Sequence, residues 1–412
     1  MGCWDSGLTE IKTVLVYRRD LISYSETFIL RQVLALRDWQ PVLVGQIDSD
    51  GLPLDSIEYH HLKLRMTMRN VRRFSRVRRY LRSLSFGTIA AARSSNSLLE
   101  SPNLQPLRER RPKLLHVHFG TDALDARHLA EALNLPMIIT LHGYDITTRA
   151  EWWESGAGGA RYCDYPQTLR ALAEQGTIFV VVSDAIAESA LEFGIPERSL
   201  RKIIIGTDLA AFTPGSIPME SRPARVLFVG RFVEKKGIDF LLKAFQLVQR
   251  KVPEAQLRLI GDGDLEEALC RKAKDLQLNA RFVGRLTPTQ VADEMHEARV
   301  LCSPSIRAAN GNSEGLPTVI MEAQACGLPV VTSARGGVTE GIIDKVTGRA
   351  FAEGDVNAMA DHLVHYLTHV ADAEKAAAAA RKFSEGNFDI GRNTKVLEAL
   401  YDEVARAGRR SD

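Results

Sequence analysis

The sequence has few cysteines, and its apolar runs are short. Its 412 residues include five cysteines, which are scattered and form no Cys-x-x-Cys pair. This usage argues against a disulfide framework and a zinc knuckle, and it is typical of a cytosolic protein. No apolar run approaches the roughly 18 residues that a membrane span needs, and the first ten residues lack the basic and apolar regions of a secretory signal. We therefore expect a cytoplasmic protein.

An excess of charge of one sign is also missing. The chain has 53 Lys and Arg against 51 Asp and Glu, a net charge of +2. The whole molecule is therefore not a polycation built for nucleic acid, and we expect no nucleic-acid partner. No Gly-x-Ser-x-Gly motif is present. Residues 261–266 read Gly-Asp-Gly-Asp-Leu-Glu, which lacks the third glycine of a dinucleotide-binding motif and predicts a tight turn instead.

The histidines leave a metal-dependent alternative, which we consider the weaker one. His116 and His118 are two residues apart on a predicted strand, and His362, His365 and His369 share one face of a predicted helix. Two histidines without a third ligand at fixed spacing are weak evidence for a metal site. A metal-dependent hydrolase of the barrel type would also need eight strand–helix units in one series. We expect neither a metal nor a cofactor.

What the sequence does contain is an alternation of short apolar runs with helical segments. The composition, 45% hydrophobic and 25% charged, is that of an ordinary globular protein, and the length suits two domains better than one. Strands are expected in the second half at 224–230, 256–261, 280–284, 299–305 and 328–333, and in the first half at 13–17, 41–45, 113–119, 137–143, 178–183 and 202–206. Strands that are apolar on both faces, with helices between them, predict parallel sheets covered on both sides.

The break between the two series predicts the domain organisation. Pro214, Gly215, Pro218 and Pro223 lie between them, so the linker is expected near 212–223. We predict an N-terminal domain at 1–217, a C-terminal domain at 218–385 and a C-terminal helix at 386–412. Two doubly wound α/β domains that face each other leave a cleft at the carboxyl ends of their strands, where such folds bind ligands.

The most informative segment is 313–331. Pro317 suits the first turn of a helix and Gly327 its C-terminal cap, which predicts a helix at 317–326. The free N–H groups near its start make a diphosphate site that needs no metal; they belong to Leu316, Thr318 and Val319. Glu322 can reach a ribose and Glu314 a sugar. The alternative is that both glutamates are merely solvated.

These motifs resemble a known enzyme family. EGLPTVIMEAQACGLPVV, at 314–331, and FVGRFVEKKGIDFLL, at 228–242, resemble the retaining nucleotide-sugar glycosyltransferases of family four, which have the GT-B fold. YSETFILRQ (24–32), HVHFG (116–120) and LHGYD (141–145) look like the subgroup that builds bacterial exopolysaccharides and colanic acid. The resemblance implies two Rossmann-like domains facing across a cleft, with the C-terminal helix crossing back to the first domain. It also implies that the N-terminal domain at 1–217 binds the acceptor and that the C-terminal domain at 218–385 binds the nucleotide-sugar.

The resemblance also assigns roles to individual residues. Arg231 and Lys236 would face the diphosphate, Glu314 the donor sugar, and His142 the region of the transferred carbon. Glu322 would contact the ribose. The remaining donor-binding residues would be Leu316, Thr318, Val319, Gly230, Gly263, Arg285 and Leu286, and the acceptor side would hold Ser25, Glu26 and His118.

Each assignment has a simpler alternative or a departure from the family beside it. Lys236 can be part of a solvated helix start, His142 a buried structural histidine, and Ser25 a helix cap. Many relatives carry a Gly-Gly loop where this chain has Ser-Tyr-Ser-Glu-Thr at 23–27, which leaves the first-domain phosphate contact open. Trp152 and Trp153 lie in a glycine-rich segment, have no family assignment and can stack on a sugar or a lipid.

The implied reaction is a metal-independent transfer that retains the configuration of the sugar. A nucleotide-diphosphate-sugar would be the donor, and a hydroxyl acceptor, a lipid-linked glycan in polysaccharide or glycolipid biosynthesis, would attack from the same face. The leaving phosphate would help to deprotonate the acceptor while the cations and the helix dipole stabilise its charge. The alternatives are a nucleotide-sugar epimerase on the same fold, transfer to a small soluble acceptor and a catalytically silent carbohydrate-binding relative.

One segment is strongly basic. Residues 59–99 hold ten basic residues and no acidic one, so the rest of the chain has a net charge of −8. Apolar residues recur at helical spacing over 63–82, which predicts a basic amphipathic helix. Such a helix, from Lys63 to Arg82, can bind the anionic inner face of the cell membrane, or it can pack its apolar side on the first domain. RNA binding is the least favoured alternative.

Overall fold

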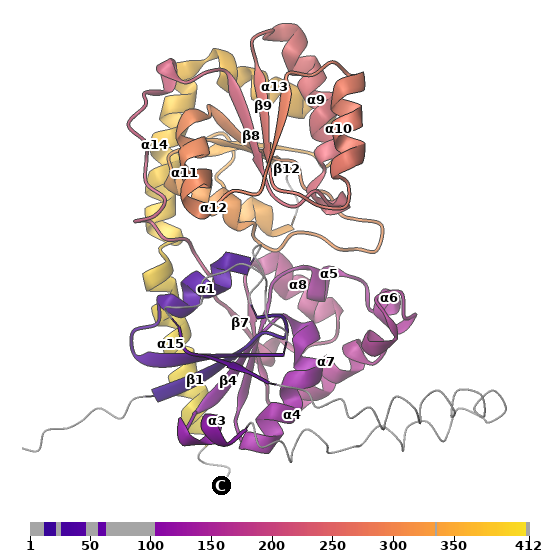
Figure 1. Ribbon diagram of the computed structural model, residues 1–412, viewed down its shortest axis with the longest axis vertical. Coiled ribbons are helices and arrows are strands. Elements are labelled where there is room, and N and C mark those ends of the chain that lie inside the picture. The colour runs from indigo at the N-terminus through magenta and orange to yellow at the C-terminus, as the bar shows by residue number, and fades with distance from the viewer. Residues whose placement is uncertain (1–11, 22–25, 47–56, 63–103, 334–335, 409–412) are drawn as a thin grey trace, which may run out of the picture.

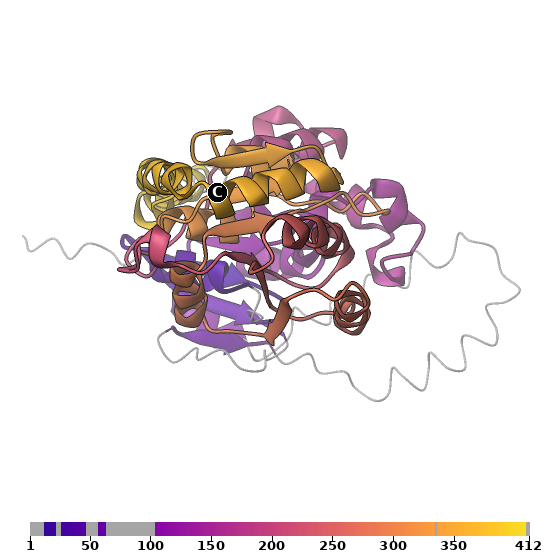
Figure 2. The ribbon, with the colours of Figure 1, turned by 90° about the horizontal axis from the view of Figure 1, so that it is seen from above.

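In the computed structural model of the chain, residues 12–21, 26–46, 57–62, 104–333 and 336–408 are described. Ser25 and the basic segment at 63–82 therefore lie outside the described residues. The described chain forms two α/β domains stacked along the long axis of the molecule (Figure 1). Viewed from above, the second domain lies over the first (Figure 2).

The first domain is built on a seven-stranded parallel sheet with the order β3-β2-β1-β4-β5-β6-β7. Its strands are β1 (Lys12–Tyr17), β2 (Trp39–Gly45), β3 (Tyr59–His61), β4 (Leu114–His118), β5 (Met137–Leu141), β6 (Ile178–Val181) and β7 (Leu200–Lys202). Its helices are α1 (Thr27–Leu34), α3 (Gln105–Glu109), α4 (Ala123–Leu133), α5 (Tyr144–Thr147), α6 (Ala150–Glu154), α7 (Tyr165–Glu174) and α8 (Asp184–Glu192).

The second domain repeats the plan with six parallel strands in the order β10-β9-β8-β11-β12-β13. They are β8 (Arg225–Val229), β9 (Gln256–Ile260), β10 (Ala280–Gly284), β11 (Val300–Ser303), β12 (Val330–Ser333) and β13 (Gly348–Phe351). The helices are α9 (Ile238–Lys251), α10 (Glu266–Asp275), α11 (Pro288–Glu297), α12 (Thr318–Ala325), α13 (Val356–Thr368), α14 (Val370–Asn387) and α15 (Ile390–Gly408). The predicted α/β architecture of two doubly wound domains is confirmed.

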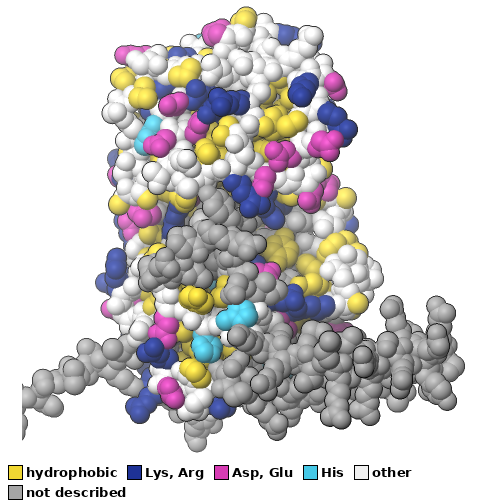
Figure 3. All heavy atoms as spheres, in the orientation of Figure 1, with side chains coloured by type: hydrophobic (Ala, Val, Ile, Leu, Met, Phe, Trp, Pro, Cys, Tyr) yellow, Lys and Arg dark blue, Asp and Glu magenta, His cyan; other side chains and the backbone are white. Residues whose placement is uncertain are grey.

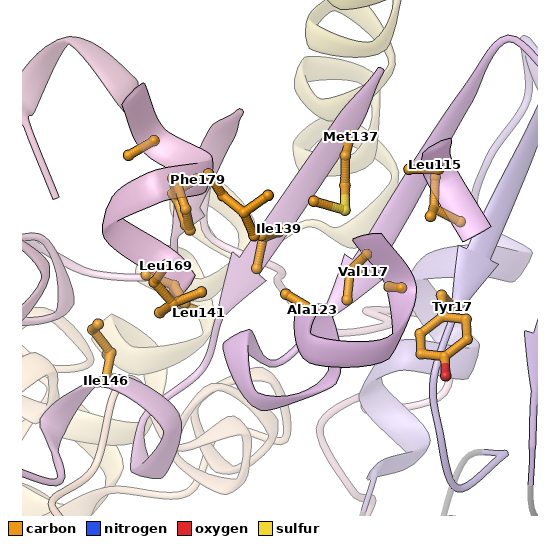
Figure 4. Packing of buried hydrophobic residues seen from close by; sticks show 14 of the residues in the cluster. Tyr17, Leu115, Val117, Ala123, Met137, Ile139, Leu141, Ile146, Leu169 and Phe179 are labelled. Atoms are coloured by element: carbon orange, nitrogen blue, oxygen red, sulfur yellow. The ribbon is translucent and has the colours of Figure 1, made fainter. Parts of the chain in front are cut away.

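Each sheet is buried on both faces. In β1, Leu15 and Tyr17 pack into one core cluster, while Val14 and Val16 pack into another on the opposite face. Figure 4 shows the first cluster, where side chains from β4, β5 and β6 meet those of the covering helices. This double burial is why the strands read as continuous apolar runs and not as alternating ones.

Three strands differ from the sequence-based expectation. β3 and β13 were not predicted, because their sequences, YHH and GRAF, lack a continuous apolar run. The strand expected at 202–206 lies instead at Leu200–Lys202. Ile203 and Ile205, which follow this strand, are buried, so this apolar run packs in the interior without being part of the sheet.

The C-terminal segment returns to the first domain, as predicted. α14 and α15 run along one side of both domains (Figure 1). α15 buries Leu397, Leu400 and Tyr401 in the first-domain core. The Glu398 carboxylate accepts hydrogen bonds from three successive backbone N–H groups just before and at the start of β2, at 2.7, 2.7 and 3.2 Å. Among the described helices, none has the length and apolarity to span a bilayer.

Candidate active site

A cavity of about 720 Å³ lies between the domains, at the carboxyl ends of both sheets. Strand-end residues of both sheets line it, including His142 after β5 and Gly230 after β8. Twelve of the residues predicted from the sequence line this one cavity: Glu26, His142, Gly230, Arg231, Lys236, Arg285, Leu286, Glu314, Leu316, Thr318, Val319 and Glu322. Elsewhere on the surface, basic and acidic side chains are interspersed over the face of the second domain shown in Figure 3.

The start of α12 faces this cavity. Pro317 is the N-cap residue and Gly327, with φ +63°, follows the last turn, which places the helix within one residue of the predicted bounds at each end. The positive end of its dipole and its unpaired N–H groups suit an anionic ligand. Gly315 lets the loop before the helix approach the other domain, because a Cβ there would lie 2.3 Å from the carbonyl oxygen of His142.

Glu314 lies between two lysines at the mouth of that loop. Its Oε1 is 3.1 Å from Nζ of Lys236 and 3.5 Å from Nζ of Lys235. Burial alone would raise the pKa of Glu314, but the two ammonium groups outweigh it and lower the pKa to about 2. Burial lowers the pKa of Lys235, and Glu314 opposes that shift. Gly237 makes the lysine turn possible, because a Cβ there would lie 1.9 Å from the carbonyl oxygen of Pro304.

Glu322 is held by a residue of the first domain. Its Oε1 is 2.9 Å from Nη1 of Arg31 on α1, and the Arg31 guanidinium also lies 4.9 Å from the centre of the Phe212 ring. Burial raises the pKa of Glu322, and Arg31 counteracts this. The carboxylate predicted to contact a ribose is therefore already part of an ion pair between the two domains.

The first-domain wall carries a second buried ion cluster. Arg18 lies directly after β1. Its Nη2 is 2.7 Å from Oε1 of Glu26, and its Nη1 is 2.6 Å from Oδ2 of Asp122. Its guanidinium also lies 4.7 Å from the centre of the Phe119 ring. Arg18 thus brings a cation to the cavity wall next to the segment where the sequence departs from its relatives.

His142 reaches the cavity from the end of β5, and its ring packs beside Phe28 and Phe119. Its Nε2 is 3.0 Å from Nδ1 of His118, which is fully buried behind it. Burial, followed by the nearby His116 and Arg18, holds the pKa of His142 well below the usual value, so the ring is neutral at pH 7. His118 supports His142 from behind and does not line the cavity.

Two adjacent regions of the chain match known glycosyltransferase families. Residues 28–211 match Glycosyltransferase Family 4, and residues 213–383 match Glycosyl transferases group 1. The chain belongs to the family four glycosyltransferases.

The relatives of this glycosyltransferase act in the synthesis of different glycans. It is 29% identical over 293 residues to the amylovoran biosynthesis glycosyltransferase AmsK of Erwinia amylovora, covering 70% of each chain. It is 28% identical over 297 residues, 68% of this chain and 74% of the other, to a GDP-mannose-dependent monoacylated α-(1-6)-phosphatidylinositol monomannoside mannosyltransferase of Corynebacterium glutamicum. Its fold matches the crystal structure of the Anabaena protein HepE in complex with UDP and glucose, with a TM-score of 0.73, 15% identity and coverage of 95% and 100%.

Some predicted residues of the glycosyltransferase lie elsewhere, and some wall residues were missed. Gly263 does not line the cavity; it packs against the backbone of Phe232, where a Cβ would lie 2.7 Å from a carbonyl oxygen. Lys235, Arg18 and Arg31 were not assigned to the site from the sequence. Arg18 follows a first-domain strand as Arg231 follows one in the second domain, which is the one local signal that could have indicated it.

The glycosyltransferase shows no metal site in the part of the chain that is described, where no three His, Cys, Asp or Glu side chains are grouped to hold an ion. His116 instead contacts the hydroxyls of Tyr401 and Thr140 through its two ring nitrogens, at 2.6 and 2.7 Å. The second histidine set is also engaged by its surroundings, since His362 contacts the carbonyl oxygen of Ala350 at 3.2 Å.

Proposed function

We propose that this glycosyltransferase transfers a sugar, with retention and without a metal, from a nucleotide-diphosphate-sugar to a hydroxyl acceptor. The observation that carries the proposal is the convergence, on one interdomain cavity, of the α12 N-terminus with Arg231, Lys235 and Lys236. Backbone N–H groups and fixed cations are what stabilises a departing diphosphate. Arg18 on the opposite wall adds a further cation.

The mechanism that we propose is attack on the same face from which the nucleotide leaves. Five carboxylates line the cavity, and four of them are paired with cations: Glu26, Asp262, Glu314 and Glu322; Asp20, the fifth, forms no ion pair within the described residues. A carboxylate held in this way is a poor nucleophile, which favours direct displacement over a covalent glycosyl-enzyme. The leaving phosphate accepts the acceptor proton, while neutral His142 and Glu314 hold the donor sugar and Glu322 and Arg285–Leu286 the nucleoside.

We propose a glycan, attached to a lipid, as the acceptor. Support comes from the relatives, one of which acts in amylovoran biosynthesis and another on a phosphatidylinositol monomannoside. Such acceptors are found at the inner face of the membrane, where the basic segment at 63–82 would bind anionic lipid. The nucleoside base is left open, because one relative is GDP-mannose-dependent and the structural neighbour is bound to UDP.

Nucleotide release from a panel of UDP-, GDP-, ADP- and TDP-sugars, with and without lipid-linked glycan extract, tests the proposal. We expect acceptor-dependent release that chelation of divalent ions leaves unchanged, and a product whose anomeric configuration matches the donor. The Glu314→Gln variant should lose about 100-fold or more of the rate, because the group beside the lysines no longer fixes their geometry.

The matched control is Glu267→Gln, an exposed glutamate on α10. Isomerisation of the donor without acceptor would instead show an epimerase, and nucleotide binding without turnover a silent relative. A Glu314→Gln variant with near-normal activity would overturn the assignment of the site.

A further inference from the structure

A second cavity, of about 280 Å³, adjoins the first. Tyr144 and Asn312 line both, so the two cavities share a wall. The rest of its wall comes from Thr121, Thr148, α6 and the segment after α6, in the first domain, and from Asn310 in the loop before α12, in the second. We call it the aromatic pocket; the residues that define it here are Tyr144, Trp152, Trp153, Tyr162, Asn310 and Asn312.

The wall of the aromatic pocket is aromatic and amide in character. The ring centres of Trp152 and Trp153 are 4.9 Å apart, and those of Trp153 and Tyr162 are 5.5 Å apart, both edge-on. Two polar atoms of the wall residues are buried and have no hydrogen-bond partner within the described chain: Nε1 of Trp153 and Oδ1 of Asn312. Unpaired buried atoms of this kind are costly. The amide side chains of Asn310 and Asn312 and the hydroxyls of Thr121 and Thr148 among the lining residues suit a ligand that carries hydroxyls.

None of the described residues that line the aromatic pocket carries a charge at neutral pH. The neighbouring cavity, by contrast, is lined by Arg18, Arg231, Lys235 and Lys236. Burying a charged group without a partner is strongly unfavourable, which disfavours a phosphate or a uronate in the aromatic pocket. The amides and threonine hydroxyls of the wall likewise disfavour an alkyl chain.

Both domains hold the aromatic pocket in shape. The backbone of Gly158 packs directly on the two indoles, since a Cβ there would lie 2.7 Å from ring atoms of Trp152 and Trp153. From the second domain, the loop with Asn310 is tied to the start of α6: Arg149 donates a hydrogen bond from Nη2 to the carbonyl oxygen of Ala309, at 2.6 Å, and from its backbone N–H to that of Asn310, at 3.2 Å.

We propose that the aromatic pocket binds one uncharged sugar residue of the acceptor glycan. The inference rests on the proposed function, which supplies the acceptor. A volume slightly below the range of small-molecule sites suits a single monosaccharide unit. Aromatic faces pack on the C–H face of a sugar ring, while the amides and hydroxyls of the wall bind its hydroxyl groups. The shared wall at Tyr144 and Asn312 puts this sugar next to the donor cavity.

The test measures binding of small glycosides in the presence of saturating UDP or GDP. The probes are methyl glycosides of glucose, mannose, galactose and N-acetylglucosamine, with methyl glucuronide as the charged counterpart. Saturation-transfer NMR and tryptophan fluorescence detect their binding. We expect at least one neutral glycoside to bind and the glucuronide not to bind. Trp152→Ala should weaken that binding about tenfold, and Trp152→Phe should restore most of it. Tyr59→Ala, at an exposed aromatic residue outside the pocket, should have no effect.

Calorimetry of UDP and GDP binding on the same samples separates the two claims. If neither nucleotide binds the wild type, the proposed function fails. If a nucleotide binds but no neutral glycoside does, or if the glucuronide binds equally well, the aromatic pocket is not an acceptor subsite. If Trp152→Ala weakens nucleotide binding itself, the pocket holds the base and the inference is wrong.

Discussion

At the scale of single residues, the site is a set of charges that are buried in pairs. Glu314 between two lysines, Glu322 with Arg31 and Glu26 with Arg18 each place a carboxylate next to a cation. An ion pair of this kind adds little net stability, but removing one partner leaves a buried charge uncompensated. The pairs therefore fix geometry in the cavity more than they stabilise the fold.

Glu314 makes the stability of the protein sensitive to acid. Its pKa is about 2 in the folded chain, below its ordinary value of 4.5. Because the folded pKa is depressed, this contribution is fully present above pH 4.5 and is lost as the pH falls toward 2. Between pH 5 and pH 3, the wild type should lose about 2 kcal/mol more of its unfolding free energy than Glu314→Gln does.

Urea unfolding of both proteins at pH 5, 4 and 3 measures this difference. Glu267→Gln, which removes an exposed carboxylate, should follow the wild type. Parallel pH curves for wild type and Glu314→Gln would contradict the lysine-induced pKa shift.

At the scale of elements, α15 is a C-terminal helix that serves the first domain. It completes that core with Leu397, Leu400 and Tyr401, and it brings Tyr401 to the ring of His116 on β4. Its strong contact is made by Glu398, which is 4% exposed and accepts the three backbone N–H groups at the start of β2.

Glu398→Ala should lower the unfolding free energy by about 1–3 kcal/mol, because three backbone donors lose their buried acceptor. Thermal and urea unfolding measure the change, and limited proteolysis should show earlier cleavage within α15. Glu403→Ala, on the exposed side of the same helix, is the control and should change stability by less than about 0.5 kcal/mol. Equal effects of the two substitutions would show that the hydrogen bonds from these three backbone N–H groups to Glu398 do not stabilise the fold.

At the scale of the whole molecule, polar contacts hold the two domains together around the cavity. Arg31 contacts Glu322, and the backbone N–H of Ser313 donates to Oγ1 of Thr147 at 2.9 Å. Lys202 contacts Glu340 at 2.6 Å. Interfaces between domains that are this polar permit relative motion.

Arg31→Met should shift the molecule toward an open arrangement, because Glu322 then remains buried without its cation unless the domains separate. Small-angle X-ray scattering should show a larger radius of gyration without ligand, and a larger increase in the Arg31→Met, Lys202→Met double variant. Arg37→Met, at an exposed position just beyond α1, is the control. An unchanged radius of gyration in the double variant would show that these pairs do not hold the closed form.

The sequence by itself determined the two parallel sheets, the position of α12 within one residue at each end and twelve of the residues that line the cavity. These features follow from local patterns: continuous apolar runs, Pro317 and Gly327 around a helix, and residues placed directly after strands. It did not determine β3 and β13, whose sequences lack a continuous apolar run. Nor could it pair Arg31 with Glu322, place His118 behind His142 or bring Asn312 and Trp153 to the same pocket. Those contacts join residues from separate elements: Arg31 and Glu322 are 291 positions apart, and His118 and His142 are 24 apart. The closure of one domain on the other and the packing of adjacent strands decide which of these side chains meet.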